Sequence, residues 1–177
     1  IPARFISSIV YDAGEHLGGE QFDFVFASYG AHCWLPDLDR WAELIHAHLK
    51  PGGKFIFVEF HPVWNALNWD SLEIEYNYFG KGNGEPYQEM SSGSYTDRSE
   101  EAKGMEYFWL HSLDEPMRGF LRRGMQLTDL TEYPYSYYAC FPNLKQDDQG
   151  RYFSEQKSGM IPMMFRMILQ KGVAAME

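Results

Sequence analysis

The sequence has little cysteine, since Cys33 and Cys140 are its only two and no Cys-x-x-Cys pattern occurs. Zinc sites and disulfide frameworks need more, so we expect no metal site and a reducing, cytoplasmic environment. Long apolar runs are also missing, and none approaches the roughly 20 residues of a membrane-spanning helix. With no signal peptide at its start, the chain is expected to make no membrane contact.

Positive charge is scarce, with 15 lysines and arginines against 25 aspartates and glutamates and a net charge of −10. Such an excess repels phosphate backbones, so we expect no nucleic-acid partner. Apolar residues are abundant: 45% of the chain is hydrophobic and 17% is aromatic. A chain of 177 residues with this composition can bury one core, and we expect a single domain.

The first part of the chain alternates strand-like runs with one helix-like segment. Apolar runs at 5–11 and 22–27 predict two strands, and the run at 55–58 predicts a third. Apolar residues recur at helical spacing after Asp37, a good N-cap, until the Lys-Pro-Gly-Gly turn at 50–53. The run at 55–58 lacks alternation, as in a parallel strand covered on both faces. This order predicts an α/β fold with a Rossmann-like, doubly wound and mostly parallel sheet.

The pattern then changes to alternating apolar and polar residues. Two segments, 72–78 and 105–109, show this alternation, and a Gly- and Ser-rich stretch separates them. They predict an antiparallel excursion over 65–111, inserted on the substrate side over the strand ends.

The last third of the chain returns to regular elements. Ser112 and Glu115 form a capping-box pattern that predicts the start of a helix, and Gly124 predicts its end. Apolar runs around 125–133 and 163–169 predict two closing strands, and the segment between them is aromatic and irregular. Helix, strand and strand therefore follow the excursion.

Two short sequence motifs occur at a specific spacing. The predicted strand at 22–26 reads Phe-Asp-Phe-Val-Phe, and Leu-Lys-Pro-Gly-Gly follows at 49–53, before the next strand. Asp12 closes the first predicted strand. Together these features resemble the class I S-adenosylmethionine-dependent methyltransferases. The resemblance implies that 1–177 is a single partial methyltransferase domain, which transfers a methyl group from S-adenosylmethionine to a small-molecule acceptor.

The resemblance also implies elements that do not precede Ile1 in this sequence. Members of that family carry a Gly-rich turn after their first strand and an acidic residue at the end of the second, which holds the ribose hydroxyls. By the resemblance, the strand at 5–11 is the third, and the strand at 22–27 has a bare edge without the first two. We consider three hypotheses: upstream residues exist outside this sequence, they were removed, or a second copy supplies the pairing in a homodimer.

The resemblance places the cofactor contacts at two strand ends. Asp12 would accept a hydrogen bond from the adenine amino group, with the backbone of Ala13 beside it. Ala27, Ser28 and Tyr29 stand at the carboxyl end of the next strand, where open α/β sheets bind ligands. The alternative for Asp12 is a loop-capping or solvated aspartate.

An oxygen or nitrogen acceptor also needs a base near its attacking atom. His32 and His61 follow strand ends and are the candidate catalytic residues, and the alternative for each is a hydrogen-bonded structural histidine. Glu59, at the end of a buried strand, needs a partner or a shifted pKa. The candidate residues of the acceptor pocket are Trp34, Trp64, Tyr95 and His111.

Two other classes of function remain open at this point. The missing glycine turn favours a non-catalytic ligand-binding or dimerisation module derived from the same fold. Open α/β sheets host many functions, so a nucleotide-cofactor oxidoreductase is a third hypothesis. The two closing strands and the turn at 50–53 disfavour it.

Overall fold

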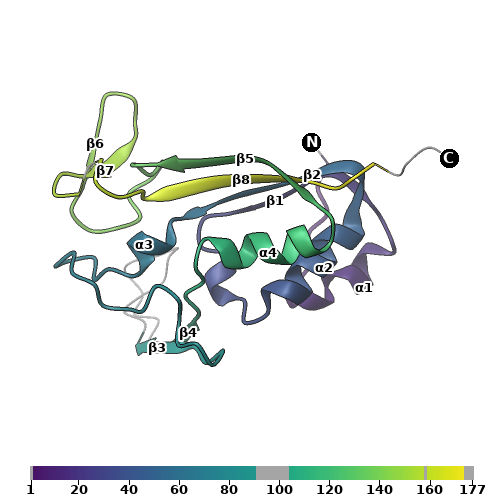
Figure 1. Cartoon of the computed structure of the whole chain (residues 1–177), viewed down its shortest axis with the longest axis horizontal. Coiled ribbons are helices and arrows are strands. Elements are labelled where there is room, and N and C mark those ends of the chain that lie inside the picture. The colour runs from purple at the N-terminus through teal and green to yellow at the C-terminus, as the bar shows by residue number, and fades with distance from the viewer. Residues whose placement is uncertain (1, 91–103, 158, 174–177) are drawn as a thin grey trace.

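The computed structural model describes residues 2–90, 104–157 and 159–173. A four-stranded sheet lies at its centre, in the order β1-β2-β8-β5 (Figure 1). Its strands are β1 (Phe22–Ser28), β2 (Leu49–Phe60), β5 (Gln126–Tyr133) and β8 (Met164–Gln170). β1 pairs parallel with β2, and β8 pairs antiparallel with β2 and β5. The predicted Rossmann-like α/β fold is confirmed, but among the described strands one pair is parallel and two are antiparallel, so the sheet is mixed and not mostly parallel.

The remaining elements are short apart from two helices. The helical segments are η1 (Val10–Asp12), α1 (Ala13–Leu17), η2 (His32–Trp34), α2 (Leu38–His48), α3 (Pro62–Asn65) and α4 (Asp114–Arg122). Two further hairpins pair β3 (Tyr87–Met90) with β4 (Met105–Phe108) and β6 (Leu144–Gln146) with β7 (Tyr152–Ser154). Figure 1 shows α2 and α4 side by side on one face of the central sheet. None of the helices in the described part of the chain is long and apolar enough to cross a bilayer.

Helix α2 forms where the sequence predicts it. The side chain of Asp37 accepts a hydrogen bond from the N–H of Arg40 at 2.9 Å and so caps the first turn. The apolar stripe is buried, and Trp41 packs its ring against Phe55 and Phe57 of β2, with ring centroids 5.4 Å apart in both pairs. The main core therefore lies between β2 and the helix pair.

A second core cluster lies at the carboxyl end of β2. It contains Phe60, Trp64, Leu67, Phe141, Met163 and Met164. The ring centroids of Phe60 and Phe141 are 5.0 Å apart, so the irregular aromatic segment after β5 packs onto the end of the sheet. This segment is thus ordered by aromatic contacts with the end of the sheet as well as by the short β6–β7 pairing within it.

The predicted strand at 5–11 is wrong. Residues 2–9 form no helix or strand, and the chain turns through η1 and α1 before β1. Phe5 is 94% exposed and Ile9 is 69% exposed, so these apolar side chains bury little surface. A short apolar run becomes a strand when a neighbouring strand offers backbone partners, and the described residues place none beside it.

The predicted strand at 72–78 is also wrong. The side chain of Asn68 accepts hydrogen bonds from the N–H groups of Asp70 and Ser71, and Leu72 has a φ of 57°. These are turn conformations, and only an isolated bridge between Leu67 and Ile74 remains. The predicted strand at 105–109 is confirmed as β4, but its partner β3 comes from the Gly- and Ser-rich stretch between the two alternating segments.

The second helix and both closing strands are confirmed as α4, β5 and β8. The predicted capping box is not formed: the N-cap of α4 is Leu113, and it makes no side-chain cap bond. Glu115 instead lies 3.1 Å from Nδ1 of His111. Gly124, with a φ of 75°, follows the last turn as predicted.

Strand β1 forms one edge of the central sheet in the described part of the chain. Phe24 and Phe26 on this strand are 63% and 61% exposed. The bare edge expected for 22–27 is therefore present, and it carries large apolar side chains.

Candidate functional site

The loop after β1 is held in an uncommon backbone conformation. Tyr29 has a φ of 55° and Gly30 a φ of 87°. A residue other than glycine adopts positive φ at a cost of roughly 1–2 kcal/mol, so its surroundings must hold it there. The N–H of Tyr29 donates to the carbonyl of Val58 on β2 at 3.0 Å. The turn lies at the carboxyl ends of two parallel strands, where open α/β sheets bind ligands.

Glu59 on β2 is fully buried, and its carboxylate holds this loop. Oε1 accepts hydrogen bonds from the N–H groups of Gly30 and Phe60, and Oε2 accepts from Ala31 at 2.9 Å. Nδ1 of His32 lies 3.1 Å from Oε2, in a contact bent away from hydrogen-bond geometry. Burial alone would raise the pKa of Glu59, but His32 and the backbone donors outweigh it and hold that pKa below its ordinary value.

His32 and His111 come from distant parts of the chain and lie together, with ring centroids 5.6 Å apart. Both are buried. Nε2 of His111 donates to the carbonyl of Leu35 at 2.9 Å, which ties the end of the excursion to the loop after β1. Burial, and then repulsion from His32, holds the pKa of His111 below its ordinary value against the opposing effect of Glu115. The structure thus brings His32, His111 and Glu59 into one buried cluster.

His61 follows β2 and caps α3. Its Nδ1 accepts a hydrogen bond from the N–H of Val63 at 3.2 Å, so the proton of the neutral ring is on Nε2. Nε2 lies 2.8 Å from Glu132, again off the line of a good hydrogen bond. Burial holds the pKa of His61 below its ordinary value, although Glu132 opposes this shift. Both ring nitrogens face protein groups, and a role of His61 as a base stays a prediction.

Asp12 lies in η1, beside the first turn of α2, and not at the end of a strand. Its Oδ1 accepts from the guanidinium of Arg40 at 3.1 Å, and the neighbouring Tyr11 hydroxyl accepts from the N–H of Asp37 at 2.9 Å. Ala13 begins α1 directly after it. The other predicted cofactor contacts, Ala27, Ser28 and Tyr29, end β1 or begin its loop and are partly exposed. Cofactor contact by these five residues stays a prediction.

The predicted acceptor-pocket residues are spread over the structure. Trp34 is 42% exposed in η2, two residues after His32. Trp64 is 1% exposed in the second core cluster, and its indole nitrogen has no hydrogen-bond partner among the described residues. His111 joins the cluster around His32, whereas Tyr95 lies outside the described residues. Their role in acceptor binding stays a prediction.

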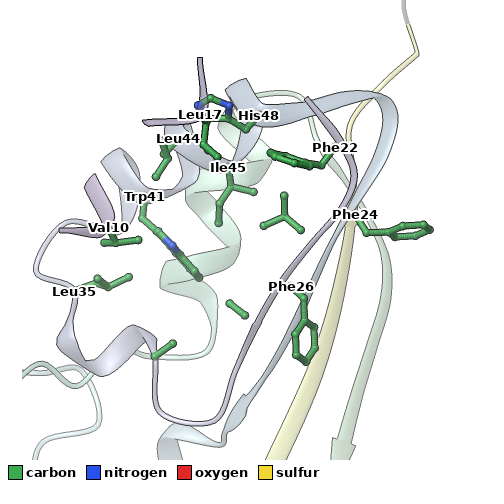
Figure 2. Close-up of a pocket in the computed structure, with 13 residues that line it drawn as sticks. Val10, Leu17, Phe22, Phe24, Phe26, Leu35, Trp41, Leu44, Ile45 and His48 are labelled. Carbon is green, nitrogen blue, oxygen red and sulfur yellow. The ribbon is translucent and has the colours of Figure 1, made fainter. Parts of the chain in front are cut away.

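An apolar groove of about 500 Å³ opens between β1 and the helices α1 and α2 (Figure 2). Phe22 and Ala27 line it from the strand side, and Trp41 and Ile45 line it from α2. His48 and the indole of Trp41 bring the side-chain nitrogen atoms in this lining. Polar groups of a nucleoside would find few hydrogen-bond partners along the groove, so its walls favour contact with apolar groups.

Two further observations limit the chemistry of the site. Burial raises the pKa of Cys33 to about 12, so its thiol is protonated at neutral pH and is a poor nucleophile. The thiol donates to the carbonyl of Gly30 at 3.3 Å and helps to hold the loop. Among residues 2–90, 104–157 and 159–173, no three His, Cys, Asp or Glu side chains gather to hold a metal ion.

The sequence interpretation missed the backbone donors of the loop. The N–H groups of Gly30 and Ala31 carry no motif, because every residue type except proline supplies a backbone N–H. The available signal was Glu59, an acid at the end of a buried strand that required a partner.

The fold and this loop together define an open α/β protein whose loop after β1 lies at the carboxyl ends of β1 and β2, the position where open α/β sheets bind ligands. Solved structures with a similar fold are S-adenosylmethionine-dependent methyltransferases. One, described as such from Listeria monocytogenes, is 17% identical with a TM-score of 0.50, and the match covers 86% of this chain and 62% of that chain. One from Mesorhizobium loti is 14% identical with a TM-score of 0.47, covering 86% and 63%.

A third similar structure is the glycopeptide N-methyltransferase MtfA in complex with S-adenosyl-L-methionine, at 14% identity and a TM-score of 0.46, covering 86% of this chain and 55% of that one. No protein-family model matches the sequence, and no curated protein matches it. The similarity to the structure from Listeria monocytogenes shows that the fold is that of the class I S-adenosylmethionine-dependent methyltransferases, as the resemblance predicted. The chain spans about three fifths of the length of the solved structures it matches.

The buried histidines predict a loss of stability in mild acid. The pKa values of His61 and His111 lie below their ordinary value of 6.5 in the folded chain, so below pH 6.5 the unfolded chain binds more protons. This contribution to stability is fully present above pH 6.5 and is lost as the pH falls toward the folded pKa values. Protonation of Nδ1 would also break the bond from Val63.

We expect the urea midpoint to fall as the pH drops below 6.5, and the double variant His61→Gln/His111→Gln to show a flatter dependence. Equilibrium unfolding followed by far-UV circular dichroism measures both. A midpoint that stays constant or rises in this window would contradict the expectation.

Proposed function

We propose that this chain takes part in S-adenosylmethionine-dependent transfer of a methyl group to a small-molecule acceptor. The observation that carries the proposal is the loop after β1, which a buried carboxylate holds at the carboxyl ends of two parallel strands of a methyltransferase-type fold. The cofactor would supply a methyl group activated on a sulfonium.

The residues present fit such a group. Asp12 offers a partly exposed carboxylate, which can accept from an exocyclic amino group. The ring of Tyr29 is 38% exposed at the strand end and packs edge-on against Tyr138, with centroids 5.5 Å apart. An aromatic face at this position would attract a sulfonium by a cation–π interaction.

The catalytic contribution of the protein would come mainly from positioning. Holding two reactants in line can remove roughly 7–11 kcal/mol of a barrier. As the acceptor attacks the methyl carbon, the bond from that carbon to sulfur breaks and a thioether leaves. Where the acceptor is a hydroxyl or a protonated amine, His32 is the candidate to take its proton, since it directly follows the loop in the chain and contacts the carboxylate that holds it.

A second candidate function is favoured by the bare edge of β1. Phe24 and Phe26 are exposed, and no strand among the described residues pairs with the outer edge of β1. Both are features of a surface that pairs with another polypeptide. On this alternative the chain is a non-catalytic ligand-binding or dimerisation module, and a homodimer would pair two such edges.

Calorimetric titration with S-adenosylhomocysteine tests the proposed function. We expect binding, and we expect Asp12→Ala to weaken it by about 10- to 100-fold, because a hydrogen bond to a charged group contributes about 1.5–3 kcal/mol. Asp23→Ala is the matched control, since Asp23 is also an exposed aspartate in an ion pair, with Lys50. Where the coding sequence continues upstream of Ile1, the longer protein is titrated beside this chain.

The outcomes separate the two candidates. Binding by the longer protein alone would keep the methyltransferase proposal and place essential contacts outside this chain. Binding by neither form would reject the cofactor. A concentration-dependent dimer without cofactor binding would then support the second candidate.

A further inference from the structure

Glu59, the buried acid near the end of β2, has several hydrogen-bonding partners. Its fully buried carboxylate accepts from three backbone N–H groups, two of which belong to the loop after β1. A buried carboxylate with such donors stays ionised, and without it the amides of Gly30 and Ala31 would lose their acceptor. The charge on Glu59 and the shape of the loop therefore depend on each other.

The loop needs this support because its backbone is strained at Tyr29. A tyrosine with a φ of 55° relaxes toward negative φ unless bonds on both sides hold it. The bond from the N–H of Tyr29 to Val58 holds one side, and the two bonds from Gly30 and Ala31 to Glu59 hold the other. Glu59 thus sets where the Tyr29 ring stands at the strand end.

The same carboxylate selects a tautomer of His32. Nδ1 of His32 lies 3.1 Å from Oε2 of Glu59, in a bent contact. A proton on Nδ1 is still favoured there, because in the Nε2–H tautomer the lone pair of Nδ1 would face a negatively charged oxygen. Nε2 of the neutral ring is then the nitrogen with a free lone pair. This is the nitrogen that can accept a proton.

We propose that Glu59 is the positioning residue of the candidate site: it holds the Tyr29–Ala31 backbone for the cofactor and keeps His32 as the Nδ1–H tautomer, with Nε2 as the proton acceptor. The proposal rests on the proposed function for its consequence in binding and catalysis. Its structural part, the held loop and the chosen tautomer, can be measured without any cofactor.

The first measurement uses the unmodified chain. Nitrogen-15 NMR of the imidazole groups is expected to show His32 as the Nδ1–H tautomer, and the amide protons of Gly30 and Ala31 are expected to resonate downfield and to exchange slowly. An Nε2–H tautomer of His32, or rapid exchange of both amides, would overturn the proposal without any variant.

The second measurement compares Glu59→Gln with Glu155→Gln, an exposed glutamate paired with Lys145. In Glu59→Gln we expect both amide resonances to move upfield, the His32 tautomer to become mixed, and S-adenosylhomocysteine to bind about tenfold more weakly or worse. Glu59→Asp, which keeps the charge on a shorter side chain, should keep more of the binding. Glu155→Gln should change none of these quantities.

The readouts distinguish failure of this proposal from failure of the proposed function. If the unmodified chain binds no cofactor but Glu59→Gln still shifts the amides and the tautomer, the proposed function fails and the positioning role stands. If Glu59→Gln folds and leaves the amides, the tautomer and cofactor binding unchanged, the positioning role is wrong. If Glu59→Gln does not fold, the measurements on the unmodified chain decide.

Discussion

Phe57→Ala is expected to lower the free energy of unfolding by about 3–5 kcal/mol, the range found for removal of a buried aromatic ring. Phe57 is fully buried in the centre of β2. Its ring lies 5.4 Å from the rings of Trp41 and Phe165 and 5.7 Å from that of Phe55. A void there would touch the sheet and α2 together, so neither could close it alone.

The same substitution is expected to disturb the candidate site. The ring of Phe57 packs edge-on against His32, with centroids 5.4 Å apart, and so forms part of the wall that holds this histidine. We therefore expect the His32 resonances to broaden or shift in Phe57→Ala at a urea concentration where the variant is still folded.

Phe26→Ala is the matched control. Phe26 lies on the neighbouring strand, is the same residue type and is 61% exposed. Its removal is expected to change the free energy of unfolding by no more than about 0.5 kcal/mol. Urea unfolding of both variants measures the difference, and similar losses in the two would mean that the β2 core is not packed as described.

Gly53→Ala is expected to cost about 1–3 kcal/mol, because a Cβ at this position cannot be accommodated without moving backbone. It would lie 2.9 Å from the carbonyl oxygen of Lys50 and 3.0 Å from that of Phe22. Gly53 stands beside the register shift where β2 first pairs with β1. An alanine there would push the start of β1 away from β2.

Gly104→Ala controls for the general effect of replacing a glycine, since a Cβ at Gly104 has no described atom within 4 Å. We expect its unfolding midpoint to stay near that of the unmodified chain. Equal midpoints for Gly53→Ala and Gly104→Ala would show that the contact between β1 and the start of β2 can accommodate a Cβ at Gly53.

The Gly53 contacts also explain why the residues at 49–53 were a useful signal, although the structure places them in the first part of β2 and not in a turn before it. The resemblance rested on Leu-Lys-Pro-Gly-Gly at a set distance after Phe-Asp-Phe-Val-Phe. In the structure these two segments lie side by side, because Leu49 pairs with Phe22 where β2 begins to pair with β1. The segments at 22–26 and 49–53 thus belong to the two strands that one crossover connection joins.

Other elements could not be assigned from pattern alone. The runs at 5–11 and 72–78 are apolar or alternating, but a strand also needs a partner for its backbone groups. Residues 2–9 have no such partner beside them in the described structure. The hydrogen bond from the N–H of Asp70 to the side chain of Asn68 holds the chain before 72–78 in a turn. Residues 87–90 lie in the stretch predicted to separate two strands, and they became β3 because β4 lies opposite.

The sequence by itself determined the α/β class, helix α2 and the two closing strands, and it predicts a candidate site at the end of β1. Periodicity and turn residues act over a few neighbours, and each of these features depends on such local spacing. The tertiary structure alone decided that Glu59 would reach Gly30 and Ala31 and that His32 would meet His111. Those contacts join residues far apart in the chain, and they exist only once strand pairing has set one loop against the other.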